Sequence, residues 1–225
     1  MMSESRSAAT ELGQEILVGP HKLGGLLTAP RSAVGIVLFA HGSGSGRFSP
    51  RNQFVASVLQ RSSVATLLFD LLSDAEAEDR RRVFDIELLA ERLQGAADWV
   101  RQQQTTCRLP VGFFGASTGA AAALVAAAQQ GEEVRAVVSR GGRPDLAGEC
   151  LPRVQAPTLL IVGGDDDVVV DLNRRALAQL RCRKELVIIP GATHLFEEPG
   201  ALEEVARLAA DWFRKFLTAD GQEHG

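Results

Sequence analysis

Residues 111–119 read Val-Gly-Phe-Phe-Gly-Ala-Ser-Thr-Gly, an apolar run that ends in Gly115-x-Ser117-x-Gly119 directly before an alanine-rich stretch. This order predicts a buried strand, a sharp turn and then a helix. A serine at such a turn has its hydroxyl lifted out of the sheet, and the amide that follows it can face an oxyanion. The turn brings backbone against backbone, so its flanking positions need glycine or another small residue. The stretch therefore predicts a nucleophile if the rest of the chain supplies a base and an acid.

The rest of the chain continues the alternation of strands and helices. Buried parallel strands read as continuous apolar runs, and such runs end at polar or glycine-rich segments throughout the sequence. We expect strands at 15–18, 22–28, 34–40, 64–69, 111–114, 134–139, 158–162 and 185–189, and helices from 50 to about 61, about 83 to 103, 117–130, 171–180 and about 202 to 217. This pattern predicts an α/β fold with a mainly parallel sheet covered by helices on both faces.

The composition is that of an ordinary globular chain. With 225 residues, 45% hydrophobic and 23% charged, it fits one domain over 1–225, with about 1–14 and 218–225 frayed. The net charge of −4 and the lack of a basic stripe give no reason to expect nucleic acid as a partner. The triple arginine at 80–82 follows acidic residues and is interpreted as part of a solvated loop.

The cysteines and the apolar runs bear on the compartment. No apolar run reaches the roughly 18–20 residues that span a bilayer, and residues 1–15 lack the hydrophobic region of a signal peptide. The three cysteines (Cys107, Cys150, Cys182) lie far apart, without the spacing of a metal site, and favour a reducing compartment. We therefore expect a cytoplasmic protein with no membrane partner. The residues leave open whether the protein forms a homodimer.

Polar candidates follow four of the expected strands. Ser117, Asp166 and His194 each come shortly after a strand, and a glycine-rich loop at 41–46 follows the strand at 34–40. Because the carboxyl ends of parallel strands meet at one edge of a sheet, these groups should converge there. The order serine, aspartate, histidine is that of an α/β-hydrolase triad.

The proposed roles follow from acid–base chemistry. His194 would accept the proton of Ser117 and pass it to the leaving group, while Asp166 would fix the tautomer of the imidazole. Asp165 and Asp167 are expected to be solvated or to cap the following helix, and Asp145 is the fallback acid.

Two further groups could assist. The backbone amides of Ser43 and Thr118 are expected to form the oxyanion hole, with His41 shaping the loop around Ser43. Arg140 and Arg143 could bind a substrate carboxylate, although pairing with surface carboxylates such as Asp145 is an equally good interpretation. The glycine-rich loop matches neither G-x-x-x-x-G-K-[ST] nor G-x-G-x-x-G, so phosphate binding there is not expected.

Taken together, the motifs resemble the α/β-hydrolase superfamily and, within it, the dienelactone hydrolase-like group. The resemblance runs from about 15 to 217 through four segments: 39–45, 114–119, 160–169 and 191–196. It implies Ser117, Asp166 and His194 as the triad. Dienelactone hydrolases proper use a cysteine nucleophile where this chain has serine, which favours a general carboxylic ester over dienelactone as substrate.

Close look-alikes of this chain are sometimes named phosphoribosyltransferases. The run Leu159–Asp166 superficially resembles a pyrophosphate-binding strand with two acids. In those enzymes a threonine- and glycine-containing phosphate loop follows, whereas here Asp167-Val-Val-Val-Asp follows. The residues thus do not favour that activity.

The sequence therefore predicts a serine hydrolase that cleaves a small carboxylic ester through an acyl-enzyme, without metal or organic cofactor. Little or no cap domain is expected, because the segment between the strands ending at 139 and beginning at 158 is short. An amidase, thioesterase or peptidase on the same triad, or a binding protein that keeps the fold, are the alternatives. The physiological substrate, its stereochemistry and the oligomeric state do not follow from the residues.

Overall fold

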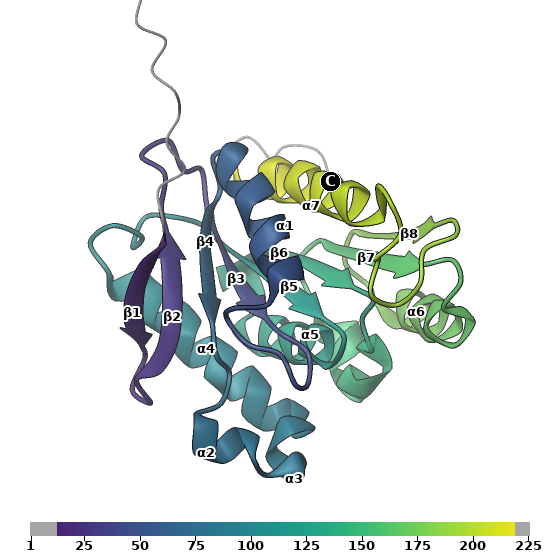
Figure 1. The fold of residues 1–225 in the computed structure, drawn as a ribbon, viewed down its shortest axis with the longest axis horizontal. Coiled ribbons are helices and arrows are strands. Elements are labelled where there is room, and N and C mark those ends of the chain that lie inside the picture. The colour runs from purple at the N-terminus through teal and green to yellow at the C-terminus, as the bar shows by residue number, and fades with distance from the viewer. Residues whose placement is uncertain (1–12, 219–225) are drawn as a thin grey trace, which may run out of the picture.

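A computed structural model describes residues 13–218 of the chain (Figure 1). The strands in this part are β1 (Gln14–Val18), β2 (Leu23–Thr28), β3 (Ile36–Ala40), β4 (Ala65–Phe69), β5 (Val111–Ala116), β6 (Val134–Arg140), β7 (Thr158–Gly163) and β8 (Lys184–Ile189). The α-helices are α1 (Pro50–Arg61), α2 (Asp74–Ala77), α3 (Arg80–Val83), α4 (Ile86–Gln102), α5 (Thr118–Gln130), α6 (Asp167–Gln179) and α7 (Ala201–Leu217), with 3-10 segments η1 (Gly131–Glu133) and η2 (Pro144–Arg153).

One sheet of eight strands runs through the described residues, in the order β1-β2-β4-β3-β5-β6-β7-β8. From β4 to β8 every neighbouring pair is parallel, while β2 is antiparallel to both β1 and β4. The expected mainly parallel sheet is thereby confirmed. Its central strands β3, β4 and β5 are buried along their whole length, which explains their continuous apolar runs.

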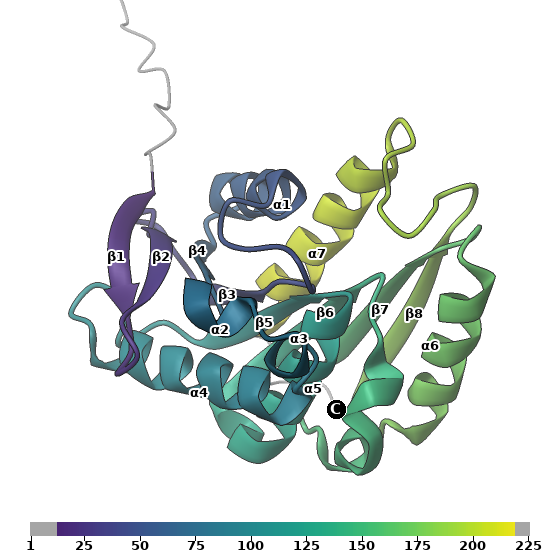
Figure 2. The same cartoon turned by 60° about the horizontal axis from the view of Figure 1, so that its bottom comes forward.

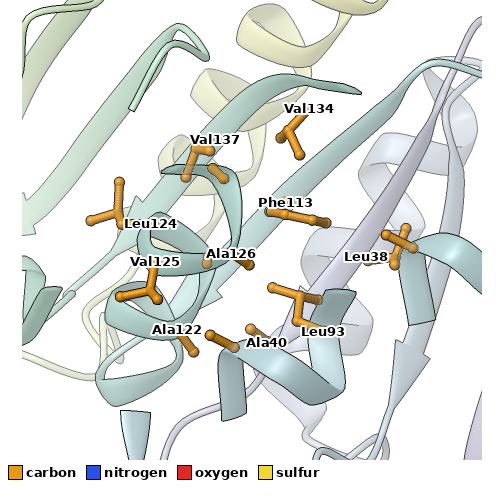
Figure 3. Packing of buried hydrophobic residues seen from close by; sticks show 14 of the residues in the cluster. Leu38, Ala40, Leu93, Phe113, Ala122, Leu124, Val125, Ala126, Val134 and Val137 are labelled. Atoms are coloured by element: carbon orange, nitrogen blue, oxygen red, sulfur yellow. The ribbon is translucent and has the colours of Figure 1, made fainter. Parts of the chain in front are cut away.

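Helices cover both faces of the sheet, as Figure 2 shows: α1 and α7 lie on one face, and α4, α5 and α6 on the other. The core on the α4–α5 side packs Phe113 of β5 against Leu93 of α4 and the small residues of α5 (Figure 3). Seven of the thirteen residues of α5 are alanine, and this helix can approach the sheet closely because their side chains add little bulk.

Three local expectations are corrected. The segment expected to be a solvated loop forms the short helices α2 and α3, which lie at the lower edge of Figure 1. Helix α6 begins at Asp167 rather than at Asp171, because the β-branched run between them adopts helical geometry once its side chains pack on β7 and β8. Gln14, expected to be frayed, pairs with Leu27 in the sheet, whereas residues 1–12 and 219–225 lie outside the described residues.

Candidate active site

Ser117 occupies a strained turn between β5 and α5. Its backbone has φ +52° and ψ −121°, a region that costs about 1–3 kcal/mol and persists only where the surroundings enforce it. The surroundings are very close here, since a Cβ at Gly115 would overlap the backbone of Ala120, and one at Gly119 would overlap the carbonyl oxygen of Ala40. The glycines on both sides of the serine are therefore required by the packing of this elbow.

His194 and Asp166 meet at the ends of the next strands along the sheet. His194 follows β8 and Asp166 follows β7, and Nδ1 of His194 lies 2.7 Å from Oδ2 of Asp166. Backbone contacts hold the two loops together: the amide of Asp165 donates to the carbonyl of Ala192 at 3.0 Å, and a Cβ at Gly163 would overlap the same carbonyl. Asp165 and Asp167 are exposed, as expected for solvated neighbours.

Residues at the end of β6 contact both Ser117 and His194. The amide of Ser117 donates to the carbonyl of Arg140 at 3.2 Å. The next residue, Gly141, has φ +51°, and a Cβ there would lie 3.6 Å from Cε1 of His194. The imidazole thus packs over Gly141, directly beside the backbone that holds Ser117. Among the described residues no hydrogen bond of the Ser117 hydroxyl is found, and the residue is half-buried.

Ser43 and Thr118, the two residues expected to supply oxyanion-hole amides, touch each other. The amide of Ser43 donates to Oγ1 of Thr118 at 3.1 Å, so in this structure it is engaged by a side chain. Thr118 is the first residue of α5, where an amide has no acceptor within the helix. A Cβ at Gly42 would lie 3.1 Å from Cβ of Ser117, which brings the loop after β3 against the elbow.

His41 holds that loop in place through both ring nitrogens. Its Nε2 accepts from the amide of Leu71 at 3.0 Å, so Nδ1 carries the proton and donates to the carbonyl of Gly42 at 3.0 Å. Burial lowers the pKa of His41, against smaller raising effects of the Gly42 carbonyl and Asp70. The neutral imidazole therefore links the loop after β3 to the end of β4, a structural role that agrees with the expectation for this histidine.

The two arginines after β6 have different surroundings. Arg143 pairs with Asp145 through two parallel contacts of 2.9 and 2.8 Å, so its guanidinium is engaged, and Asp145 does not contact His194. This pairing raises the pKa of Arg143. Arg140 is 8% exposed and has no such partner within the described part of the chain. The sequence alone could not assign different roles to the two arginines, because both follow the strand expected at 134–139.

A cavity of about 440 Å³ opens beside the loop after β3. Its polar side is formed by residues 41–45 and by Arg47 and Asp70, which form an ion pair. Its apolar side comes from the end of β4 and from α3 and α4, namely Leu71, Leu72, Val83 and Leu89. This wall does not follow from the sequence, since Val83 reaches the cavity only through the folding of α3.

The described residues contain no group of three or more His, Cys, Asp or Glu side chains placed to hold a metal ion. None of the helices described is both long and apolar enough to cross a bilayer. The polar groups gathered at the strand ends are those of acid–base and nucleophilic chemistry.

Comparison with known proteins points to one family. Residues 33–210 match the model of the alpha/beta hydrolase domain. A protein of Mycobacterium tuberculosis named "Putative phosphoribosyl transferase" is 59% identical over 207 residues, which are 92% of this chain and 47% of that protein. The chain thus spans about half the length of this curated relative.

Solved structures agree with the family match. A dienelactone hydrolase from Anabaena variabilis is 60% identical, covers 91% of this chain and 96% of its own, and superposes with a TM-score of 0.87. A serine hydrolase without lid from Xanthomonas campestris shares the fold at 22% identity, with a TM-score of 0.73 over 94% of this chain and 97% of its own.

Proposed function

The chain belongs to the α/β-hydrolase family, and on this premise we propose that it is a serine hydrolase that cleaves a small carboxylic ester through an acyl-enzyme. The observation that carries the proposal is the 2.7 Å contact of His194 with Asp166, on loops that pack beside the strained turn of Ser117. These groups lie far apart in the sequence, and a structural role explains neither their convergence nor the strained backbone of Ser117.

The chemistry follows from these positions. Oγ of Ser117 attacks the ester carbonyl carbon while Nε2 of His194 takes its proton. The tetrahedral intermediate collapses as the same nitrogen gives that proton to the leaving alkoxide, which departs as an alcohol. Water then repeats the sequence on the acyl-enzyme and releases the acid. Asp166 accepts from Nδ1–H, which leaves Nε2 unprotonated for the first step and stabilises the imidazolium that forms.

The amides of Ser43 and Thr118 are proposed to donate to the developing oxyanion. Losing one such donor typically costs about 3–4 kcal/mol of transition-state stabilisation. The Ser43 amide now donates to the Thr118 hydroxyl, so the oxyanion must share this amide or displace the hydroxyl.

The position of His194 indicates on which side of Ser117 the leaving group and the acyl group of the ester would lie. The leaving oxygen has to face Nε2 of His194, which lies on the β6–β8 side of Ser117. The acyl group then points the other way, towards β3 and β4, where the 440 Å³ cavity opens. We assign this cavity to the acyl group. Its size lies at the lower end of small-molecule sites, in keeping with a small ester.

The name of the mycobacterial relative is not carried over to this chain. A pyrophosphate site built on the acids after β7 would need Asp166 free, and its carboxylate is bonded to His194. The relative is about twice as long as the matched part, so its name also covers a region with no counterpart in this alignment.

Labelling with a fluorophosphonate probe tests the proposal. The intact protein should label, and Ser117→Ala should not, whereas the control Ser32→Ala, at an exposed serine away from the site, should label like the wild type.

Asp166→Asn should lower kcat on a p-nitrophenyl ester about 10⁴-fold, because the imidazole loses its preferred tautomer. Equal labelling of wild type and Ser117→Ala would contradict the mechanism. Matched anilide and thioester substrates separate esterase from amidase and thioesterase.

A further inference from the structure

The guanidinium of Arg140 is buried without a partner. The residue is 8% exposed, and its Nε and Nη1 atoms are shielded from solvent with no hydrogen bond. In the part of the chain that the structure describes, no carboxylate forms an ion pair with it. The pKa of Arg140 is lowered to about 10, first by burial and then by the like charge of Arg51, so it remains charged at neutral pH.

Such an arrangement is costly for a folded protein. Buried charges are normally paired, and one left uncompensated is strongly destabilising. Unpaired buried groups that persist in a fold therefore call for a ligand or a functional reason. A second guanidinium nearby increases the cost, since the Nε of Arg51 is also buried without a partner.

Neither Glu197 nor Glu198 pairs with Arg140, and Oε2 of Glu198 is itself buried without a hydrogen-bond partner. Oε1 of Glu197 lies 3.3 Å from Nη1 of Arg51, and Oε1 of Glu198 accepts from the hydroxyl of Thr193 at 2.6 Å. The guanidinium of Arg140 instead lies 6.0 Å from the ring centroid of Phe196, a weak contact for a charge of this kind. Within the described residues no carboxylate therefore offsets the charge of Arg140 by direct contact.

Arg140 lies beside the proposed catalytic groups. The carbonyl of Arg140 accepts from the amide of Ser117, and Phe196 comes two residues after His194. The backbone of Arg140 ends β6, which lies between β5, the strand before Ser117, and the strands β7 and β8 that lead to Asp166 and His194. By the mechanism above, the leaving alcohol lies on the β6–β8 side of Ser117.

We propose that Arg140, assisted by Arg51, binds an anionic group carried by the leaving alcohol of the ester. A carboxylate or a phosphate meets the requirement, because both present oxygen pairs that match the fork of a guanidinium. The inference rests on the proposed function only in naming the leaving alcohol as the carrier. Binding of the anion itself follows from the unpaired charge.

Hydrolysis of matched esters tests the inference. Butyryl glycolate and 2-butyryloxyethyl phosphate carry the two anions on the leaving alcohol, and 2-methoxyethyl butyrate is the neutral counterpart. In the wild type, kcat/KM should be higher for at least one anionic ester. Arg140→Met should reduce the ratio of anionic to neutral kcat/KM about 10- to 100-fold, the value of a hydrogen bond to a charged group. The ratio should be unchanged in Arg61→Gln, at the distant end of α1. A ratio that is the same in wild type and Arg140→Met would overturn the proposal while leaving the hydrolase intact.

Binding without turnover separates this inference from the proposed function. In the Ser117→Ala background, calorimetric titration with butyryl glycolate or 2-butyryloxyethyl phosphate should show binding that Arg140→Met weakens. This readout holds even if no ester is hydrolysed. The two ligands also show which anion is preferred. Binding that is equally strong with and without the Arg140 guanidinium would refute the site.

Thermal stability gives a third readout. The proposal predicts that Arg140→Met raises Tm, whereas a purely structural role of Arg140 predicts that it lowers Tm. With no anion present, Arg140→Met removes an uncompensated charge and should raise Tm by about 2–4 °C, as expected for a gain of about 1 kcal/mol in a chain of this size. Glycolate should raise the Tm of the wild type and not of the variant. A fall in Tm for Arg140→Met would mean that the guanidinium stabilises the fold through its own contacts, against the proposal.

Discussion

At the scale of single residues, the hydroxyl of Thr118 links the nucleophile elbow to the loop after β3. It accepts a hydrogen bond from the amide of Ser43. Without this bond, the proposed role of the amide would leave it dependent on the substrate for an acceptor. In the proposed oxyanion hole this bond sets the direction of the Ser43 amide before substrate arrives, and the oxyanion then shares the amide with the hydroxyl or displaces it.

Replacement of Thr118 tests this arrangement. Thr118→Val keeps the shape and removes the acceptor, at a cost of about 1 kcal/mol for the lost bond, so kcat should fall about fivefold. Thr118→Ser keeps the hydroxyl and should retain most of the activity. Steady-state kinetics on a p-nitrophenyl ester would measure both. A higher kcat in Thr118→Val would instead indicate that the hydroxyl competes with the oxyanion for the amide.

At the scale of elements, α2 and α3 line one side of the cavity proposed to hold the acyl group. A capping box between Ser73 and Glu76 starts α2, and Glu76 also pairs with the buried Arg92 at 3.1 Å, which fixes the segment to α4. The backbone of Ser73, more than any other contact, lowers the pKa of Glu76. This segment brings Val83 into the wall of the cavity.

Enlarging Val83 should change which acyl groups fit. Val83→Phe places a ring in the cavity, so kcat/KM should fall about tenfold or more for octanoate relative to acetate esters, since a misfit of even one methylene in such a pocket has an effect of this size. Leu17→Phe, an equivalent change at an exposed position of β1, should leave the chain-length profile unchanged. A profile unaffected by Val83→Phe would place the acyl group elsewhere.

At the scale of the whole molecule, His41 makes stability depend on pH. Burial lowers its pKa below the ordinary value of 6.5, so the folded protein favours the neutral ring while the unfolded chain takes up a proton. The contribution to stability is therefore complete above about pH 6.5 and is lost as the pH falls towards the lowered pKa.

Denaturant unfolding over a range of pH values would measure this effect. The difference in unfolding free energy between the wild type and His41→Gln should be largest at neutral pH and should shrink below pH 6.5. His21→Gln, in the turn between β1 and β2, provides the control and should leave the wild-type pH dependence in place. A difference that is independent of pH would show that His41 is not held neutral.

Much of the architecture was predictable because the sheet is buried on both faces. Apolar runs such as Val111–Phe114 can form only a central strand in this context, and the predicted and observed strands differ mainly at their ends. The start of α6 was not predictable, since Val168-Val169-Val170 has strand propensity, which packing on the sheet overrides. The helices α2 and α3 were not predicted either, because each is too short to show a hydrophobic period.

The residues alone predict which strand ends carry a serine, an aspartate and a histidine, because parallel connectivity sends the carboxyl ends of the strands to one edge of the sheet. The pairings depend on the fold: Asp166 contacts the imidazole, Asp145 pairs with Arg143, and Arg140 has no ion-pair partner among the described residues. Pairing depends on distances of a few ångströms between loops remote in the chain. The local sequence indicates where each strand stops and its loop begins. The packing of neighbouring loops determines which side chains come into contact.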